Sequence, residues 1–384
     1  MKKINLSEPN LSGNEKKYLI RCVDDNWVSS NGDYVKKFEN KIKKITKSKF
    51  VSSCINGTSA LHLGLKVLGV KKNDEVIVPT LTFVAPINAI IYNQANPVFM
   101  DVDDYFNIDQ NKFEDFINNK TFVGKNGFRY NKKTKNKIAA IIPVHIFGNA
   151  VNINKILLIC KKNKIKILED ASESLGTFYK RDQFKLKHTG TIGDAGVISF
   201  NGNKIATSGG GGIFLTKYKK YNNKFKYYAN QAKDNKIYSK HDDVGYNYQM
   251  SNLNAALGLA QLEKLNIFIN NKTKINNYYK TLFKNTKFSI VDSPEYSKNN
   301  YWLNILRINK KTFSIKKIIE ILKKNNIESR PIWRLNHLQK IFNKYENYKI
   351  NKANILLKNS LCLPSSSNLK LKDIEKIVKI ICEI

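Results

Sequence analysis

Along the first half of the chain, short and nearly continuous apolar runs alternate with longer stretches in which apolar residues recur every three or four positions. The short runs are typical of strands buried on both faces, and the longer stretches are typical of amphipathic helices. We therefore expect an α/β fold in which helices cover both sides of a mostly parallel sheet. The expected strands are residues 50–55, 75–79, 97–102, 138–144 and 166–169, and the expected helices between them are residues 60–68, 82–93, 107–118 and 152–162.

The two ends of the chain have different patterns. Two helices, at residues 13–25 and 34–47, are expected before the first strand, and residues 119–137, rich in Lys, Asn and Gly, are expected to form an exposed insertion or loop. After residue 253 the pattern indicates a smaller α+β unit, so we expect a large domain at 1–253 and a small domain at 254–384. The elements expected in the small domain are a long helix at 254–282, strands at 287–291 and 301–308, and helices at 315–324 and 371–383.

Polar residues stand where the expected strands end. Asp101, His145 and Asp170 lie at or just beyond the ends of three strands, and the turn at residues 56–59 joins another strand to its helix. Ligands of parallel sheets bind beyond these strand ends, so the residues are expected to converge. The amides that open the helix after residue 56 are suited to an anion, although Asn, Ser and Thr are also ordinary helix caps. His145 is equally compatible with a core position, and Glu169 is expected to be structural.

One lysine stands out in the stretch at residues 199–212, which reads S-F-N-G-N-K-I-A-T-S-G-G-G-G. Apolar strands are expected on either side of it, at 195–200 and 213–216. A lysine between buried strands is costly unless it is paired or used, and the glycines at 209–212 allow a sharp turn and a close approach to a ligand. An exposed lysine on a glycine-rich hairpin is the alternative. The polar residues upstream favour Lys204 as a lysine that forms a Schiff base with a carbonyl compound.

The composition is strongly basic, because 66 Lys and Arg against 31 Asp and Glu give a formal net charge of +35 over 384 residues. Such an excess suggests a nucleic-acid partner. However, the lysines are spread along the whole chain together with many Asn and Ile, and no nucleic-acid-binding motif accompanies them. We interpret the charge as a general compositional bias and expect no nucleic-acid partner.

The sequence also argues against several other classes of protein. Its five cysteines have no C-x-x-C spacing and its five histidines have no metal-ligand spacing, so we expect a reducing compartment and no metal site. The N-terminus lacks the apolar segment of a signal peptide. The longest apolar-rich run, residues 138–151, is too short to span a bilayer. We expect a cytoplasmic protein with no membrane association.

A lysine that forms a Schiff base with pyridoxal 5'-phosphate (PLP) needs partners for the rest of the cofactor. A carboxylate must pair with the pyridine nitrogen, a flat side chain must cover the ring, and amides and hydroxyls must bind the phosphate. Asp170 is the candidate for the carboxylate and Phe83 is the candidate for the flat side chain. The candidates for the phosphate site are Gly57, Thr58 and Ser199.

Seven motifs follow one another along most of the chain. They are N-G-T-S-A-L at 56–61, D-E-V-I-V-P-T-L-T-F at 74–83, P-V-F-M-D-V at 97–102, P-V-H-I-F-G at 143–148, E-D-A-S-E-S-L-G at 169–176, S-F-N-G-N-K at 199–204 and G-Y-N-Y at 245–248. In this order they resemble the sugar-nucleotide aminotransferases of the DegT/DnrJ/StrS family. The resemblance implies the type I fold of PLP enzymes, with a large α/β domain and a smaller C-terminal α+β domain.

The resemblance also implies roles for individual residues. It implies that Lys204 carries the cofactor as a Schiff base, that Asp170 pairs with the pyridine nitrogen and that Glu173 lies beside the cofactor's hydroxyl group. It further implies that Asn247 reaches the phosphate from a partner subunit, so the active site would lie at the interface of a homodimer. The implied substrates are L-glutamate and a nucleotide-linked sugar.

Within the family, the chain looks most like enzymes that aminate C4 of a UDP-4-keto-6-deoxy-N-acetylhexosamine on the legionaminic-acid and bacillosamine routes of bacterial surface-glycan synthesis. This likeness rests on S-F-N-G-N-K-I, the glycine run, and the stretches W-V-S-S-N-G at 27–32, H-D-D-V-G-Y-N-Y at 241–248 and N-Y-W-L-N at 300–304. The residues that it places near the sugar substrate are Trp27, Ser29, Ser30, Arg330, Trp333 and His337.

Two positions bear on which reaction is expected. Gln249 stands where most relatives have Arg, which leaves the recognition of the donor's carboxylate open. Some relatives have histidine in place of Lys204 and have become dehydratases, so the lysine here favours transamination. The alternatives are GDP-perosamine synthesis, amination at C3, sugar dehydration, and a catalytically dead fold that binds nucleic acid.

Overall fold

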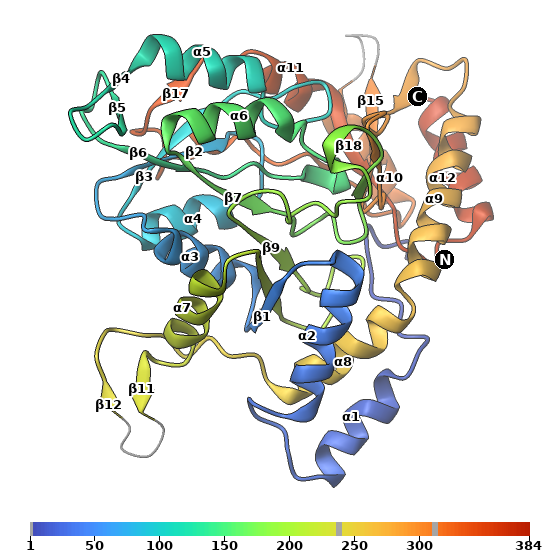
Figure 1. Cartoon of the computed structure of the whole chain (residues 1–384). Coiled ribbons are helices and arrows are strands. Elements are labelled where there is room, and N and C mark those ends of the chain that lie inside the picture. Colours follow the sequence, from blue (N-terminus) through green and yellow to red (C-terminus); the bar gives the residue numbers. More distant parts are fainter. Residues whose placement is uncertain (1–2, 236–239, 309–313) are drawn as a thin grey trace.

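The computed structural model describes residues 3–235, 240–308 and 314–384, and its centre is an eight-stranded sheet (Figure 1). Only β10 runs antiparallel to its two neighbours, and the other neighbouring strands are parallel. The expected mostly parallel sheet is therefore confirmed. In spatial order the strands are β1 (Phe50–Cys54), β10 (Gly212–Thr216), β9 (Ala195–Ser199), β7 (Lys166–Asp170), β6 (Ile138–Ile141), β2 (Glu75–Pro79), β3 (Asn96–Met100) and β17 (Asn347–Tyr348).

Helices cover both faces of this sheet, as continuous apolar strands require. On one face α5 (Gln110–Lys120) and α6 (Ile153–Asn163) pack together, and on the other α3 (Gly57–Leu68) contacts both α4 (Ala85–Tyr92) and α7 (Lys219–Ala229) (Figure 1). Strand β2 shows why both faces are apolar. Its Val76 and Val78 belong to the core under α3, whereas Ile77 belongs to the core under α5 and α6.

The C-terminal part forms a second, antiparallel sheet in the order β13 (Phe288–Ile290), β15 (Asn304–Ile308), β18 (Ser360–Leu363) and β16 (Arg330–Pro331). A separate apolar core joins this sheet to α9 (Leu265–Leu282), α10 (Ile315–Lys324) and α12 (Leu371–Cys382). The other α-helices of the described residues are α1 (Glu15–Asp24), α2 (Asp33–Thr46), α8 (Asn252–Glu263) and α11 (Lys352–Asn359). The other strands form three pairs: β4 (Thr121–Val123) with β5 (Arg129–Asn131), β8 (Phe178–Tyr179) with β14 (Ser297–Lys298), and β11 (Lys233–Asn235) with β12 (Lys240–His241).

The structure differs from one expectation and refines another. The helix expected at 254–282 is two helices, α8 and α9, which part at Lys264 because α8 packs against α1 and α2 while α9 packs against α12. The loop expected at 119–137 contains the hairpin of β4 and β5. Its polar residues are partly buried in hydrogen bonds, since Asn131 Nδ2 donates to Glu75 Oε2 over 2.8 Å.

The division at residue 253 stays a prediction, and several contacts cross it. Strand β17, from the C-terminal part, lies parallel to β3 at the edge of the large sheet. The N-terminal segment crosses in the other direction: Ile4 pairs with Ile327, and the backbone amide of Ser365 donates to Leu6. The two parts of the chain are therefore tied together by backbone hydrogen bonds at more than one place.

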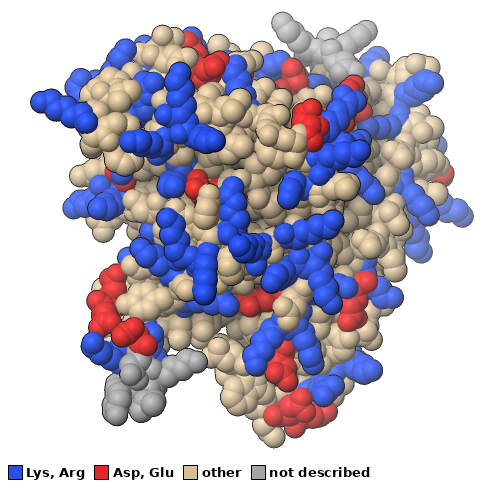
Figure 2. Space-filling model, viewed as in Figure 1, with Lys and Arg blue, Asp and Glu red and all other residues tan. Residues whose placement is uncertain are grey.

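On the face shown in Figure 2, the positive charge is spread out rather than gathered in one patch. Figure 2 shows Lys and Arg over the whole visible face, with Asp and Glu scattered among them. Within the described ranges, every helix is too short or too polar to cross a bilayer.

Candidate active site

Lys204 lies in the loop that joins β9 to β10, and its amine is enclosed by a carboxylate and an aromatic ring. Its Nζ is 3.4 Å from Glu173 Oε1 and 4.1 Å from the centre of the Trp302 ring. The side chain is only 12% exposed. A lysine so placed is neither a surface charge nor an unpaired buried charge, which excludes the exposed-hairpin alternative.

Glu173 follows the end of β7 and is buried. Its Oε2 accepts a hydrogen bond of 2.8 Å from the backbone amide of Phe147, a residue in the left-handed region with φ of 55°. That conformation is uncommon for a bulky residue and is found mostly where surrounding contacts enforce it. Burial raises the pKa of Glu173 to about 7, although the charge of Lys204 opposes the rise. The carboxyl is therefore balanced between its charged and neutral forms near neutral pH.

Asp170, the last residue of β7, is also buried, and its Oδ1 accepts a hydrogen bond of 3.0 Å from the amide of Ser172. Burial raises the pKa of this carboxyl, while the hydrogen bonds from Ser172 and the charges of Lys204 and His145 oppose the rise. The positive charge of Lys204 therefore favours the charged form of Asp170. Asp101, in contrast, binds Lys112 and the amides that open α11, so it stabilises a helix start rather than the surroundings of Lys204.

His145 and Glu169 form a buried pair behind Asp170. The amide of Val151 donates to His145 Nδ1, so Nε2 carries the proton and donates to Glu169 Oε2 over 3.0 Å. Glu169 also accepts hydrogen bonds from three backbone amides, those of Gly190, Ile192 and Gly193. Burial alone would raise the pKa of Glu169, but the hydrogen bonds from His145 and these amides hold it below its usual value. Both side chains thus have hydrogen-bond partners inside the core.

The turn between β1 and α3 forms a small cradle. Helix geometry leaves the amides of Gly57 and Thr58 without acceptors inside the helix, while Asn56 Oδ1 caps the amide of Ser59 at 2.8 Å. A Cβ at position 57 would lie 2.9 Å from Ser199 Cβ, so only glycine keeps the space open. A Cβ at Gly212 would lie 2.3 Å from the carbonyl oxygen of Asn56, which explains why glycine packs beneath this turn.

Four aromatic side chains line one side of the same region. The Trp333 ring stacks on Phe147 at 4.8 Å between centroids, and it lies 6.1 Å from Trp302 and 6.3 Å from Phe83. Phe83 is 52% exposed and therefore has a free surface for a flat ligand. Sequence reasoning assigned no role to Phe147 or Trp302, because the only signal for them was their place within the motifs P-V-H-I-F-G and N-Y-W-L-N.

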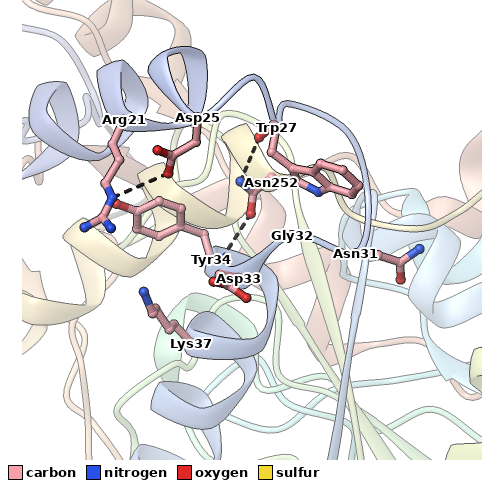
Figure 3. Close-up of a pocket in the computed structure, with 9 residues that line it drawn as sticks. All are labelled: Arg21, Asp25, Trp27, Asn31, Gly32, Asp33, Tyr34, Lys37 and Asn252. Carbon is pink, nitrogen blue, oxygen red and sulfur yellow. Dashed lines mark hydrogen bonds and ion pairs between the residues drawn. The ribbon is translucent and has the colours of Figure 1, made fainter.

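The remaining residues predicted from the sequence are not joined to Lys204 by any contact that the described ranges show. Trp27 lines a cavity of about 280 Å³ beside α8 (Figure 3). Asn252 supports this loop, since its Nδ2 donates to the carbonyl of Trp27 and its amide donates to that of Ser29. The residues around this cavity are Arg21, Asp25, Trp27, Asn31, Gly32, Asp33, Tyr34, Lys37 and Asn252.

The other predicted substrate residues have local partners or are exposed. Ser30 lies in the same loop as Trp27 and is half-buried. Arg330 forms an ion pair of 2.7 Å with Glu328, and His337 Nδ1 lies 2.6 Å from Thr80 Oγ1. Asn247 is exposed on the segment that follows β12. The functional roles of all these residues stay predictions.

A family model describes nearly the whole chain. The DegT/DnrJ/EryC1/StrS aminotransferase family matches residues 9–382.

The chain belongs to this family.

Individual relatives agree with the assignment. The chain is 35% identical to a GDP-perosamine synthase of Escherichia coli O157:H7 over 91% of its own length and 90% of that protein. It is 30% identical to a UDP-4-amino-4,6-dideoxy-N-acetyl-beta-L-altrosamine transaminase of Campylobacter jejuni subsp. jejuni, over 77% of this chain and 74% of the relative. The structure of Helicobacter pylori PseC, an aminotransferase of pseudoaminic acid biosynthesis, shares the fold with a TM-score of 0.88, at 23% identity over 100% of this chain and 99% of that one.

Family membership makes the protein a PLP-dependent sugar aminotransferase, and the residues present fit the cofactor. The open cradle at Gly57 combines helix amides with the hydroxyl of Ser199, which suits a phosphate group. The buried carboxyl of Asp170 is at the end of β7, and the enclosed amine of Lys204 follows β9, the neighbouring strand. These residues could therefore hold the phosphate, the ring nitrogen and the aldehyde carbon of PLP.

The raised pKa of Glu173 leads to a testable prediction for the cofactor-free protein. Between pH 4.5 and about 7, the folded protein holds a proton on Glu173 that the unfolded chain releases, so this residue lowers stability as the pH rises. Glu173→Gln removes that dependence. We expect the free energy of unfolding of the variant, minus that of the wild type, to increase by about 2 to 3 kcal/mol across this window. Urea denaturation at several pH values measures the difference, and a difference independent of pH would contradict the prediction.

Proposed function

We propose that the protein transfers the amino group of L-glutamate to C4 of a nucleotide-linked 4-keto-6-deoxy sugar, and that UDP-4-keto-6-deoxy-N-acetylhexosamine is its acceptor in bacterial surface-glycan synthesis. The observation that carries the proposal is the enclosed amine of Lys204, held beside Glu173 in a family of sugar aminotransferases. A transaminase needs one amine that can both remove and return a proton, and Lys204 is the amine that we propose for this role.

In this proposal each group of the site has one task. When bound, PLP supplies an electron sink that makes the hydrogen on the donor's α-carbon acidic. Asp170 binds the protonated ring nitrogen, Phe83 covers the ring, and Glu173 lies beside the ring hydroxyl. The phosphate is bound by Gly57, Thr58 and Ser199, together with Asn247 of the partner subunit.

Lys204 Nζ performs the proton transfers. In the first half-reaction it would accept the proton that leaves the α-carbon of L-glutamate, the amino group would stay with the cofactor, and water would supply the keto oxygen of the departing 2-oxoglutarate. In the second half-reaction Nζ would return a proton to C4 of the sugar, which receives the amino group while its keto oxygen leaves as water. The contact of 3.4 Å with Glu173 Oε1 limits the positions that the long lysine side chain can adopt, which supports this role.

Lys204→Ala is expected to abolish turnover while cofactor binding persists through the phosphate site. The absorbance spectrum tests the donor half-reaction without any sugar. For the wild type, L-glutamate should replace the visible band of the aldehyde form with the near-ultraviolet band of the amine form, and the variant should show no such change. A Lys204→Ala variant that converts at a rate close to that of the wild type would contradict the proposed role.

The acceptor is supported by the Campylobacter jejuni relative, whose name specifies a UDP-linked 4-amino-4,6-dideoxy sugar. The GDP-perosamine synthases are the second candidate, because the relative from Escherichia coli is 35% identical to this chain. Amination at C3 is a third possibility that shares the same cofactor residues.

Competition between the acceptors separates these candidates. We expect kcat/KM for UDP-4-keto-6-deoxy-N-acetylglucosamine to exceed that for GDP-4-keto-6-deoxymannose by about tenfold or more, since binding groups matched to one nucleotide leave polar groups unpaired with the other. Nuclear magnetic resonance of the product should place the new amine on C4. A preference for the GDP-linked sugar, or an amine on C3, would replace this acceptor with one of the alternatives.

We also propose that the enzyme works as a homodimer in which Asn247 completes the partner's phosphate site. The segment that carries Asn247 is attached to its own subunit on both sides, because Tyr248 accepts a hydrogen bond of 2.8 Å from the amide of Ile55 and Tyr246 packs edge-on against His62. Asn247 itself is left exposed between these two anchors. It is therefore available to a second chain.

Mixed dimers test the contribution from the partner. Lys204→Ala dimers should be inactive and Asn247→Ala dimers weakly active, and subunit exchange between them should create dimers with one intact site and one doubly altered site. If half of the dimers are mixed, activity should rise to about a quarter of the wild-type level, since only one site in two is whole in these dimers. If Asn247 served its own subunit, activity after exchange would stay at the mean of the two parent variants.

A further inference from the structure

The amine of Lys204 has a second close neighbour besides Glu173. Trp302 is 2% exposed, and the centre of its ring lies 4.1 Å from Lys204 Nζ. Its indole Nε1 donates a hydrogen bond of 2.8 Å to the carbonyl oxygen of Asn203, the residue just before Lys204. The ring is therefore attached to the same loop that carries the lysine.

Further contacts connect Trp302 to the other residues of the site. Its backbone amide donates to Asn300 Oδ1 over 3.0 Å, and Asn300 Nδ2 donates to the carbonyl oxygens of Glu173 and Leu175. The Trp333 ring lies nearly parallel to the indole at 6.1 Å. Trp302 thus contacts the loop of Lys204 directly and the segment of Glu173 through Asn300.

A buried lysine of α9 also donates a hydrogen bond to the backbone of Trp302. Lys272 of α9 is buried, and its Nζ donates to the carbonyl oxygen of Trp302 over 3.0 Å and to that of Ser365. Burial lowers the pKa of Lys272 to about 7. A lysine buried with carbonyl partners is costly, so its position indicates that the backbone of Trp302 is held firmly.

We propose that Trp302 is a positioning residue which holds the Lys204 ammonium group against the face of its indole whenever the amine is free of the cofactor. The inference rests on the proposed role of Lys204 as the proton-transfer group. A cation over the face of tryptophan is attracted by the ring's quadrupole, and the attraction is strongest where water is excluded. Because the ring carries no charge, it steadies the ammonium group without adding a third titrating group beside Glu173 and Asp170.

The first test uses the cofactor-free protein. Reductive methylation across a range of pH, followed by mass spectrometry of the peptide, reports how readily the neutral amine of Lys204 forms. The charged groups around this amine are Asp170 at the end of β7, Glu173 just beyond it, and Lys272 on the backbone carbonyl of Trp302, and all three remain in every variant. Trp302→Leu should shift the midpoint of the labelling profile to lower pH by about half to one unit and leave its plateau unchanged.

Two further variants separate the ring from its hydrogen bond. Trp302→Phe keeps an aromatic face but loses the bond to Asn203, so its profile should stay close to that of the wild type. A fluorinated tryptophan incorporated at position 302 keeps the shape and the N–H but weakens the negative face, so its profile should shift as that of Trp302→Leu does. This last variant also keeps the test valid if Trp302→Leu does not fold. Phe283→Leu, in the separate core of the small sheet, is the matched control for lost packing and should show no shift.

The second readout is the rate of conversion by L-glutamate in the PLP-loaded enzyme, which requires no sugar. Trp302→Leu should slow it by about three- to tenfold with little change in KM, because the ammonium state of Nζ loses its π partner. The inference would be overturned if both Trp302→Leu and the fluorinated variant had the labelling profile of the wild type. It would also be overturned if Trp302→Phe shifted as much as Trp302→Leu, or if Phe283→Leu shifted at all. If instead Lys204→Ala converts normally with L-glutamate, the proposed function itself fails.

Discussion

A lysine and a glutamate buried side by side are the constraint on which the rest of the site depends. Removing two charges from water costs more than their attraction returns unless further contacts stabilise them. The rise in the pKa of Glu173 to about 7 shows that burial outweighs the pull of Lys204 alone. Both partners have such further contacts. The Phe147 amide donates a hydrogen bond to Glu173, and the indole of Trp302 lies against Lys204.

The fold can supply these contacts because its parallel strands end at one edge of the sheet. Glu173 follows β7, Lys204 follows β9, and Phe147 lies beyond β6, so three segments distant in sequence meet where neighbouring strands stop. Trp302 comes from the C-terminal part of the chain. Its contact with Lys204 means that this amine has all its neighbours only when the two parts of the chain are packed together, which the crossing N-terminal segment and β17 help to secure.

The sequence predicts the groups that lie at the ends of strands much better than the groups that only tertiary packing brings into position. Asp170 and the turn at 56–59 were identifiable because the apolar runs marked where strands end, and the glycine run marked the loop of Lys204. No local pattern marks Trp302 as a neighbour of Lys204, nor the left-handed conformation of Phe147. For the same reason the continuous helical periodicity at 254–282 concealed the break at Lys264, where the chain exchanges one set of packing partners for another.

The charges near Lys204 differ from the net charge of the whole chain, and this difference gives the basic composition a role in attracting anions. Around the reacting amine the described structure places the carboxyls of Glu173 and Asp170, while Arg330 is paired with Glu328 and Gln249 is neutral. The proposed substrates, L-glutamate and a sugar nucleotide, are both anions, so attraction from a distance must come from elsewhere. The net charge of +35, whose Lys and Arg side chains are spread over the face shown in Figure 2, provides a field of the right sign for anionic substrates in general. Such a field raises the rate of encounter without requiring a concentrated basic patch, which is the feature that a nucleic-acid interface would need.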